Sequence, residues 1–281
     1  MKQIIIIISS LFLSMVSIIA HAQNKPITEV KIGTEASFYP YNFTKPDGTL
    51  DGFEIELARY LCEKMQVKCS YVVQPFDSII PALNAGKFDV IMSGLTNTPK
   101  RAEVVDFTAS YMAGPQVFAT MKNSPLAKLP HDGENLSLDG DKATIDQTMN
   151  DVKAALKGHV IGVQTASLAQ SLAAAYFKDV ATIREYKLTE QHDLDLRSGR
   201  VDALIAAQSY FRVLQKKPGF EDLIMVGPFY KGGILGEGAG IGLRKNSPEL
   251  QAMFNQAIAQ AIKEGVVKEL GIKWFGVDVT P

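Results

Sequence analysis

The segment 93–101 combines residue types that could hold a small anion. The apolar residues before it are typical of a buried strand that ends at Ser93, and Thr98 followed by a proline is typical of a helix start. A helix start exposes backbone N–H groups, and Arg101 adds a planar guanidinium that can bind both oxygens of a carboxylate. The segment therefore predicts a carboxylate receptor centred on Arg101.

A second charged residue, Glu35, follows another apolar run and is expected at the same sheet edge. Its carboxylate could contact an ammonium or guanidinium group at the far end of a ligand that Arg101 holds. Each of these two charged residues also has an alternative interpretation that involves no ligand. Arg101 could pair with Glu103 or Asp106 on a solvated helix face, and Glu35 could be a surface charge at a strand end.

Aromatic and hydroxyl side chains accompany these two charges. Aromatic faces stack on guanidinium groups or cover an aliphatic stem, and hydroxyl groups donate hydrogen bonds to carboxylates. A core position is the alternative for each aromatic residue, and for Phe53 it is the more common outcome. The candidates are Phe38, Tyr39, Phe53, Phe76, Thr165 and Ser167.

The elements that position these residues occur twice in the sequence. Residues 83–91 and 196–204 share a helix end, a glycine and an apolar strand, and residues 33–37 resemble 163–167. Each half therefore predicts a β-α-β-α-β unit with a mainly parallel sheet flanked by helices. The expected helices span about 53–65, 77–85, 167–177 and 190–198, and the expected strands between them about 69–74 and 180–186.

Two such units predict an α/β protein of two lobes. Because ligands of open α/β sheets bind outside the carboxyl ends of the strands, we expect these two sheet edges to face each other across a ligand-binding cleft. We expect lobe 1 at 23–114 and 240–281, lobe 2 at 115–239, and a hinge of two crossover segments. The stretch 123–158 has no counterpart in the first half. It predicts a surface loop up to Gly140 followed by an amphipathic helix.

Composition excludes several classes of function. The 281 residues carry a net charge of −1, which provides no basic surface for nucleic acid. The histidines His21, His131, His159 and His192 lack zinc-ligand spacing, and neither a phosphate-binding loop nor a nucleophile elbow is present. We therefore expect no catalytic residues, no metal and no cofactor.

The N-terminus predicts export. Lys2, an apolar run over 4–19 and the small-x-small pattern of residues 20–22 form a signal peptide cleaved after Ala22. An uncleaved anchor is the alternative. Export would permit Cys62 and Cys69 to form a disulfide, although two free buried thiols stay open on this argument.

The chain resembles the periplasmic solute-binding proteins for polar amino acids that serve ABC importers, solute-binding protein family 3. The signature helix start at 52–58 and the segment 93–101 carry the resemblance. The Cys62–Cys69 spacing matches that of the histidine- and lysine/arginine/ornithine-binding proteins, which implies a disulfide. Similarity is greatest to the octopine- and nopaline-binding branch, through residues 62–65, 123–158, 226–228 and 273–281.

The resemblance implies the type II periplasmic binding protein fold, a periplasmic location, a monomer and a membrane permease as partner. It also implies that Arg101 and two hydroxyl residues hold the α-carboxylate of the ligand, that two aromatic residues sandwich its side chain, and that Glu35 contacts a distal cation. The other matching positions are Thr96 and Ser167 for the carboxylate, Phe38 and Phe53 for the sandwich, and Ser93 and Gly94 for further polar contacts.

One departure from the family concerns the ligand. The lysine/arginine/ornithine and histidine binders carry an aspartate for the α-ammonium near Ala207, which this chain lacks. Opines, whose secondary α-nitrogen bears an extra carboxyl arm, need that aspartate less. We therefore expect an arginine-like or opine-like solute. The alternatives are a cyclohexadienyl dehydratase on the same fold, with Glu35 or Glu237 as its acid, and a membrane-tethered sensory module.

Overall fold

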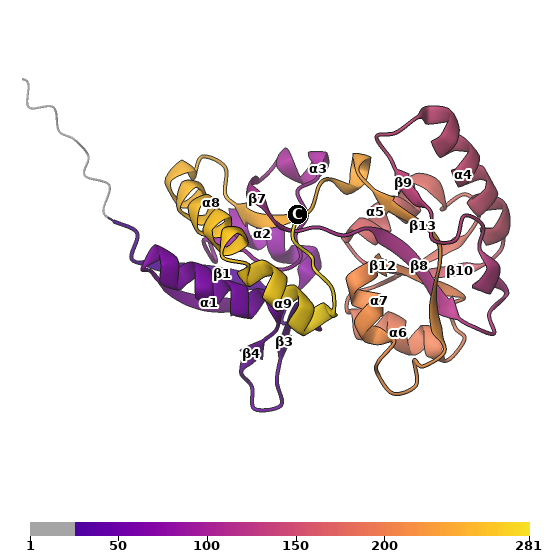
Figure 1. The fold of residues 1–281 in the computed structure, drawn as a ribbon, viewed down its shortest axis with the longest axis horizontal. Coiled ribbons are helices and arrows are strands. Elements are labelled where there is room, and N and C mark those ends of the chain that lie inside the picture. The colour runs from indigo at the N-terminus through magenta and orange to yellow at the C-terminus, as the bar shows by residue number, and fades with distance from the viewer. Residues whose placement is uncertain (1–25) are drawn as a thin grey trace, which may run out of the picture.

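The computed structural model describes residues 26–281 as two lobes, each built around its own sheet (Figure 1). This arrangement confirms the expected two-lobed α/β fold. The expected signal peptide at 1–22 lies outside the described residues, as does its cleavage site after Ala22. None of the described helices is both long and apolar enough to span a bilayer.

The first lobe contains a mixed sheet of five strands. In sheet order they are β5 (Lys68–Val73), β1 (Glu29–Thr34), β6 (Val90–Ile91), β14 (Ala239–Leu243) and β7 (Asp106–Met112). β1 is parallel to β5 and β6, whereas β14 returns from the far end of the chain and is antiparallel to β6 and β7.

Helices cover both faces of this sheet because its buried strands are apolar on both sides. Val90 belongs to a core cluster that includes three helices of this lobe. Ile91, which points to the opposite face, belongs to a second cluster that includes a fourth. The three helices are α1 (Phe53–Met65), α8 (Pro248–Lys263) and α9 (Val266–Phe275), and the fourth is α2 (Ile79–Asn84), preceded by a 3-10 turn at Phe76–Ser78.

The second lobe repeats the parallel core of the first. Its sheet order is β11 (Thr182–Tyr186), β10 (Val160–Gln164), β12 (Ala203–Ala207), β8 (Gln116–Met121), β13 (Leu223–Lys231) and β9 (Asn135–Ser137). β10 is parallel to β11 and β12, as β1 is to β5 and β6. Its helices are α4 (Lys142–Leu156), α5 (Leu168–Tyr176), α6 (Thr189–Arg197) and α7 (Gln208–Leu214).

The backbone after the first strand of each half has the same unusual shape. Ala36 follows β1 with φ of 59°, and Ala166 follows β10 with φ of 62°. A positive φ is uncommon for a residue other than glycine and concentrates at functional positions. The two turns that carry Glu35 and Thr165 are therefore equivalent in backbone conformation as well as in sequence.

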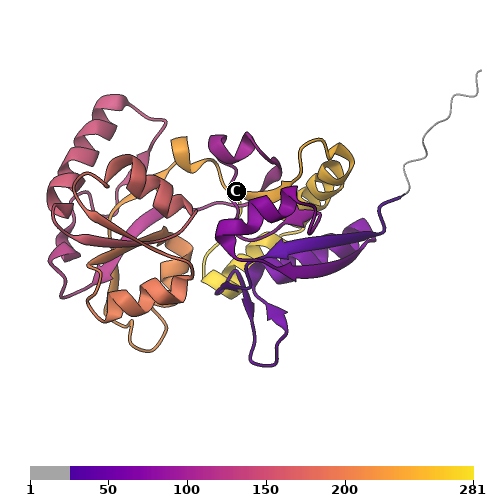
Figure 2. The same cartoon turned by 180° about the vertical axis from the view of Figure 1, so that it is seen from behind.

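Two crossover segments, 113–115 and 232–238, connect the sheets (Figure 2). The C-terminal residues pack beside the first crossover, where the Ala113 N–H donates to the Val279 carbonyl at 3.0 Å. Ala239 was expected at the end of lobe 2, but it pairs with Met112 in β7 and so begins the return strand of lobe 1.

Three local elements differ from the sequence expectations. Residues 135–137, expected as loop, form strand β9 because they pair in parallel with β13. A small three-stranded sheet, β2 (Ser37–Phe38), β3 (Asn42–Thr44) and β4 (Leu50–Asp51), follows the Glu35 turn. After α8 the chain forms a further helix, α9, which was not expected from the sequence and whose Val267 and Phe275 are buried.

Cys62 and Cys69 form a disulfide that links the end of α1 to β5. Replacing both with serine should lower the free energy of unfolding by about 2 kcal/mol, because the bridge restricts only a short loop of the unfolded chain. Urea denaturation of the oxidised wild type and the double variant measures this difference. Neither cysteine lines the cavity described below, so a change in ligand affinity would contradict this purely structural role.

Candidate functional site

A cavity of about 540 Å³ lies between the lobes, at the carboxyl ends of β1 and β10. This volume suits a small solute. Eight of the eleven candidate residues from the sequence line it: Glu35, Phe38, Phe76, Ser93, Gly94, Thr96, Arg101 and Ser167.

Arg101 lies on the short helix α3 (Pro99–Ala102), whose start is capped by the Thr98 side chain as the sequence predicts. Its guanidinium donates to the carbonyl oxygens of Thr96 at 3.0 Å and of Ala166 at 2.9 Å, and it lies 5.6 Å from the centre of the Phe76 ring. Burial lowers the pKa of Arg101 to about 10, so the group stays charged at neutral pH.

Within residues 26–281 no carboxylate pairs with Arg101. Asp106 was one of the two carboxylates that could have paired with Arg101, but its side chain pairs with Lys245 at 2.9 Å. Because the Arg101 partners are neutral carbonyls, the guanidinium keeps an uncompensated positive charge at the cavity wall. A ligand carboxylate would supply the missing counter-charge.

Glu35 supplies the opposite charge. Its side chain is buried, and its Oε1 atom accepts from Ser37 at 3.1 Å and, across the cleft, from Gln164 at 2.7 Å. Its Oε2 atom has no partner among the described residues. Burial raises the pKa of Glu35 to about 7, and Glu54 and Asp77 add to the rise by repulsion. A ligand cation would reverse this effect by stabilising the ionised form.

A buried carboxylate behind the cavity positions both segments that carry the candidate charges. Glu54, in the first turn of α1, accepts from the Gly94 N–H at 2.6 Å, from the Tyr111 hydroxyl and from Asn42 Nδ2 at 2.6 Å. The Asn42 Oδ1 atom in turn accepts from the Ala36 N–H at 2.8 Å. Glu54 therefore connects the loop that precedes Arg101 to the turn that carries Glu35. Burial raises the pKa of Glu54, and the three donors oppose that rise.

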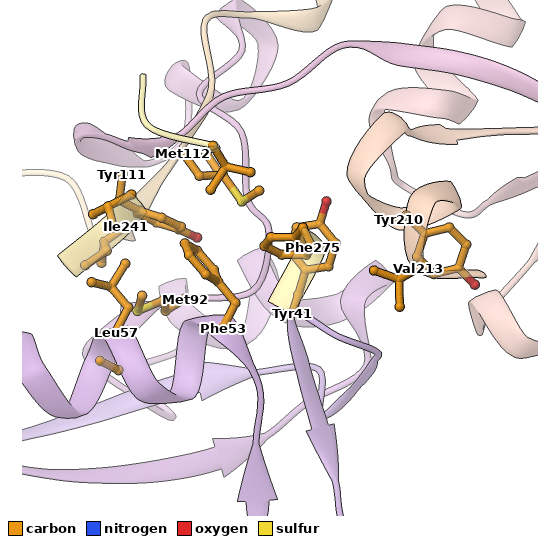
Figure 3. Packing of buried hydrophobic residues seen from close by; sticks show 14 of the residues in the cluster. Tyr41, Phe53, Leu57, Met92, Tyr111, Met112, Tyr210, Val213, Ile241 and Phe275 are labelled. Carbon is orange, nitrogen blue, oxygen red and sulfur yellow. The ribbon is translucent and has the colours of Figure 1, made fainter. Parts of the chain in front are cut away.

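Three of the candidate residues lie elsewhere: Phe53, Thr165 and Tyr39, whose ring packs edge-on against Phe43. Phe53 has no exposed surface and packs between Tyr111 and Phe275, with ring centroids 6.4 and 5.2 Å away (Figure 3). The core alternative therefore holds for Phe53, because the first turn of α1 points this ring beneath the sheet. Thr165 faces away from the cavity, and its hydroxyl donates to the Tyr186 carbonyl at 3.2 Å.

Three of the lining residues already make hydrogen bonds within the protein. The Gly94 N–H is taken by Glu54, and the Ser93 hydroxyl accepts from the Glu35 N–H at 3.0 Å. Ser167 caps α5 by accepting from Gln170, and its own proton goes to the Gln164 carbonyl at 2.6 Å. These contacts show that 93, 94 and 167 shape the site in this state.

Contacts between the lobes surround the cavity. Besides the Gln164–Glu35 and Arg101–Ala166 hydrogen bonds, Phe38 stacks on Tyr210 of α7 at 5.4 Å between ring centroids. A further contact joins the lobes here, because the hydroxyl oxygens of Tyr41 and Ser209 lie 2.5 Å apart. Figure 3 shows Tyr41 and Tyr210 on the two sides of this boundary between the lobes.

Sequence reasoning missed several cavity residues. Gln164 directly precedes the predicted Thr165, and its place at the end of a repeated strand is a signal that could have identified it. No comparable local signal identifies the others, which long-range packing brings to the cavity: Tyr41, Gln116, Asn135, Ser137, Thr189, His192, Ser209, Tyr230 and Lys231. The described residues contain no cluster of three metal-ligating side chains.

Replacing Glu54 with glutamine should lower the free energy of unfolding by about 1–3 kcal/mol, because an amide NH₂ would face donors that have lost their acceptor. It should also weaken ligand binding, since both loops lose their common anchor. Thermal unfolding and ligand titration measure the two effects. Glu56→Gln on the same helix is the control, because its exposed pair with Lys273 contributes less than about 1 kcal/mol. Equal effects of both substitutions would contradict the positioning role.

The comparisons with known proteins agree with this geometry. A family model of bacterial extracellular solute-binding proteins, family 3, matches residues 30–277. The octopine-binding periplasmic protein of Rhizobium meliloti is 42% identical, over 93% of this chain and 94% of its own. The L-arginine-binding protein of Pseudomonas aeruginosa is 34% identical, over 97% and 96% respectively.

Solved structures show the same fold. An ancestral arginine-binding protein bound to arginine superposes with a TM-score of 0.73 at 30% identity, covering 90% of this chain and all of that one. An ancestral amino-acid-binding protein described as a precursor of cyclohexadienyl dehydratase has a TM-score of 0.69 at 28% identity, covering 88% and 95%. The relatives are named as binding proteins, so the enzymatic alternative has no support from them. The chain belongs to the bacterial extracellular solute-binding proteins of family 3.

Proposed function

We propose that this protein is the periplasmic solute-binding component of an ABC importer and that it captures an arginine-like or opine-like solute. The observation that carries the proposal is one cavity with an unpaired guanidinium, Arg101, and a buried carboxyl, Glu35. A ligand that bears a carboxylate and a distal cation satisfies both groups. The names of the octopine- and arginine-binding relatives support the same class of solute.

In the proposed complex, Arg101 binds the ligand carboxylate through two parallel N–H bonds, with Thr96 and Ser167 beside it. Glu35 binds the distal cation, and the Phe38 and Phe76 rings cover the stem between the two charges. Each lobe contributes part of the site, so the ligand stabilises the closed arrangement of the lobes. A membrane permease would recognise that arrangement in an exported, monomeric protein cleaved after Ala22.

Replacing Arg101 with methionine should abolish the thermal stabilisation that L-arginine or octopine gives the wild type, because the carboxylate loses its counter-charge. Differential scanning fluorimetry over a ligand series measures the loss. Lys100→Met removes a positive charge from the same helix at an exposed position and should leave the stabilisation intact. If Arg101→Met retained the full stabilisation with both ligands, the assigned role would be wrong.

The affinity for L-arginine should rise about tenfold between pH 6 and pH 8, since binding requires ionised Glu35, whose pKa is about 7 in the free protein. The ligand-free fold should change in the opposite sense. A carboxyl with a raised pKa binds more protons when folded, so stability falls as pH rises towards 7. Glu35→Gln should lower the affinity and remove the pH dependence in calorimetric titrations. An unchanged pH profile in this variant would place the titrating group elsewhere.

A further inference from the structure

His192 is a buried polar side chain that lines the cavity and lacks a hydrogen-bond partner there. It lies on α6, and only 1% of its surface is exposed. Its Nε2 atom makes no hydrogen bond among the described residues. Because an unpaired polar atom in a protein interior costs about 1–3 kcal/mol, His192 calls for a partner that a ligand could supply.

One set of contacts places His192 at the Glu35 end of the cavity. Alternate residues of a strand face the same way, so position 162 of β10 shares a face with Gln164. A methyl group at Gly162 would lie 3.5 Å from His192 Cβ, and the Gln164 side chain donates to Glu35 at 2.7 Å. His192 therefore lies beside the lobe 2 residue that reaches Glu35.

A second set of contacts leads to the same place. The His192 ring packs edge-on against Tyr210, with ring centroids 6.1 Å apart, and Tyr210 in turn stacks on Phe38 at 5.4 Å. Phe38 belongs to β2, which follows the turn that carries Glu35. Two independent routes, through Gln164 and through Tyr210, thus connect His192 to the segment 35–38 of lobe 1.

Asp193 determines which nitrogen of His192 can accept a hydrogen bond. One oxygen of Asp193 lies 3.0 Å from His192 Nδ1, and the other accepts from the Tyr210 hydroxyl at 2.6 Å. A carboxylate beside one imidazole nitrogen favours the proton on that nitrogen. Neutral His192 therefore keeps its proton on Nδ1 and has the lone pair of Nε2 free to accept.

Glu35 and His192 provide two separate acceptors from opposite lobes. Within residues 26–281, neither Glu35 Oε2 nor His192 Nε2 has a partner. The other carboxylate in the described lining, Glu237, lies beside the loop that leads to Arg101, because the carbonyl of residue 238 accepts from the Asn97 N–H at 3.1 Å. A planar guanidinium has five N–H donors and can span two acceptors, whereas an ammonium is a compact point charge.

We propose that His192 is a specificity-determining residue: its Nε2 atom accepts from the distal group of the ligand, so that the site selects a guanidinium over an ammonium. This proposal rests on the proposed function and makes its substrate class more specific, namely solutes whose side chain ends in a guanidinium. Glu35 compensates the positive charge, and His192 contacts a second edge of the same planar group. Asp193 is the positioning residue that fixes the imidazole.

Isothermal titration with matched pairs of probes tests the proposal. L-arginine and L-lysine form one pair, and their derivatives with a carboxyethyl group on the α-nitrogen form the other. Within each pair, one side chain ends in a guanidinium and the other in an ammonium. The wild type should bind the guanidinium member at least about tenfold more tightly. His192→Leu should weaken that member about tenfold and the ammonium member less than about twofold, as expected for one hydrogen bond to a charged group.

Two further variants separate this role from a structural one. His192→Gln keeps an acceptor near the position of Nε2 and should retain most of the preference for the guanidinium member. His159→Gln, at a lobe 2 histidine outside the cavity lining, is the control and should alter neither affinity.

Three outcomes would overturn the role of His192 while leaving the proposed function intact. They are equal weakening of both members by His192→Leu, the same loss in His192→Gln as in His192→Leu, and a wild type that binds the ammonium member as tightly as the guanidinium member. Failure of the wild type to bind either guanidinium probe would refute the proposed function itself.

Discussion

The site depends on one buried carboxylate, Glu54. Burying a charge is costly unless donors surround it, and here a backbone N–H, a tyrosine hydroxyl and an asparagine amide do so. Those donors belong to the parts of lobe 1 that must be held in place. The Gly94 N–H holds the loop that leads to Arg101, and Asn42 holds the turn after Glu35. The hydrogen bonds that stabilise the buried Glu54 carboxylate therefore also fix the positions of Arg101 and Glu35 relative to each other.

Those two charges are held in an unfavourable state, which the proposed ligand would relieve. Arg101 is desolvated and meets only neutral carbonyl oxygens, and Glu35 is desolvated enough to bring its pKa to about 7. In the free protein, Gln164 and the Ala166 carbonyl of lobe 2 partly satisfy them. In the proposed complex, a zwitterionic ligand would replace these weaker contacts with full counter-charges, which would couple ligand binding to the relation between the lobes.

Each lobe lines one side of the cavity. The two charges of the proposed site, Arg101 and Glu35, both belong to lobe 1. From the other side, the stretch 123–158 adds Asn135 and Ser137 of strand β9 to the lining, and the second crossover adds the carboxylate of Glu237.

The sequence by itself determined the repeated β-α-β-α-β order, the Thr98 cap before Arg101 and the strand-end position of Glu35, because periodicity, capping and turn chemistry are local. Only the tertiary structure decided that Phe53 lies in the core while Phe76 faces Arg101, since both positions are apolar and near the same sheet edge. It also decided that Thr165 turns away and that Tyr230 reaches the cavity. These outcomes depend on cross-strand register and on how the lobes pack, which residue spacing along one chain does not encode.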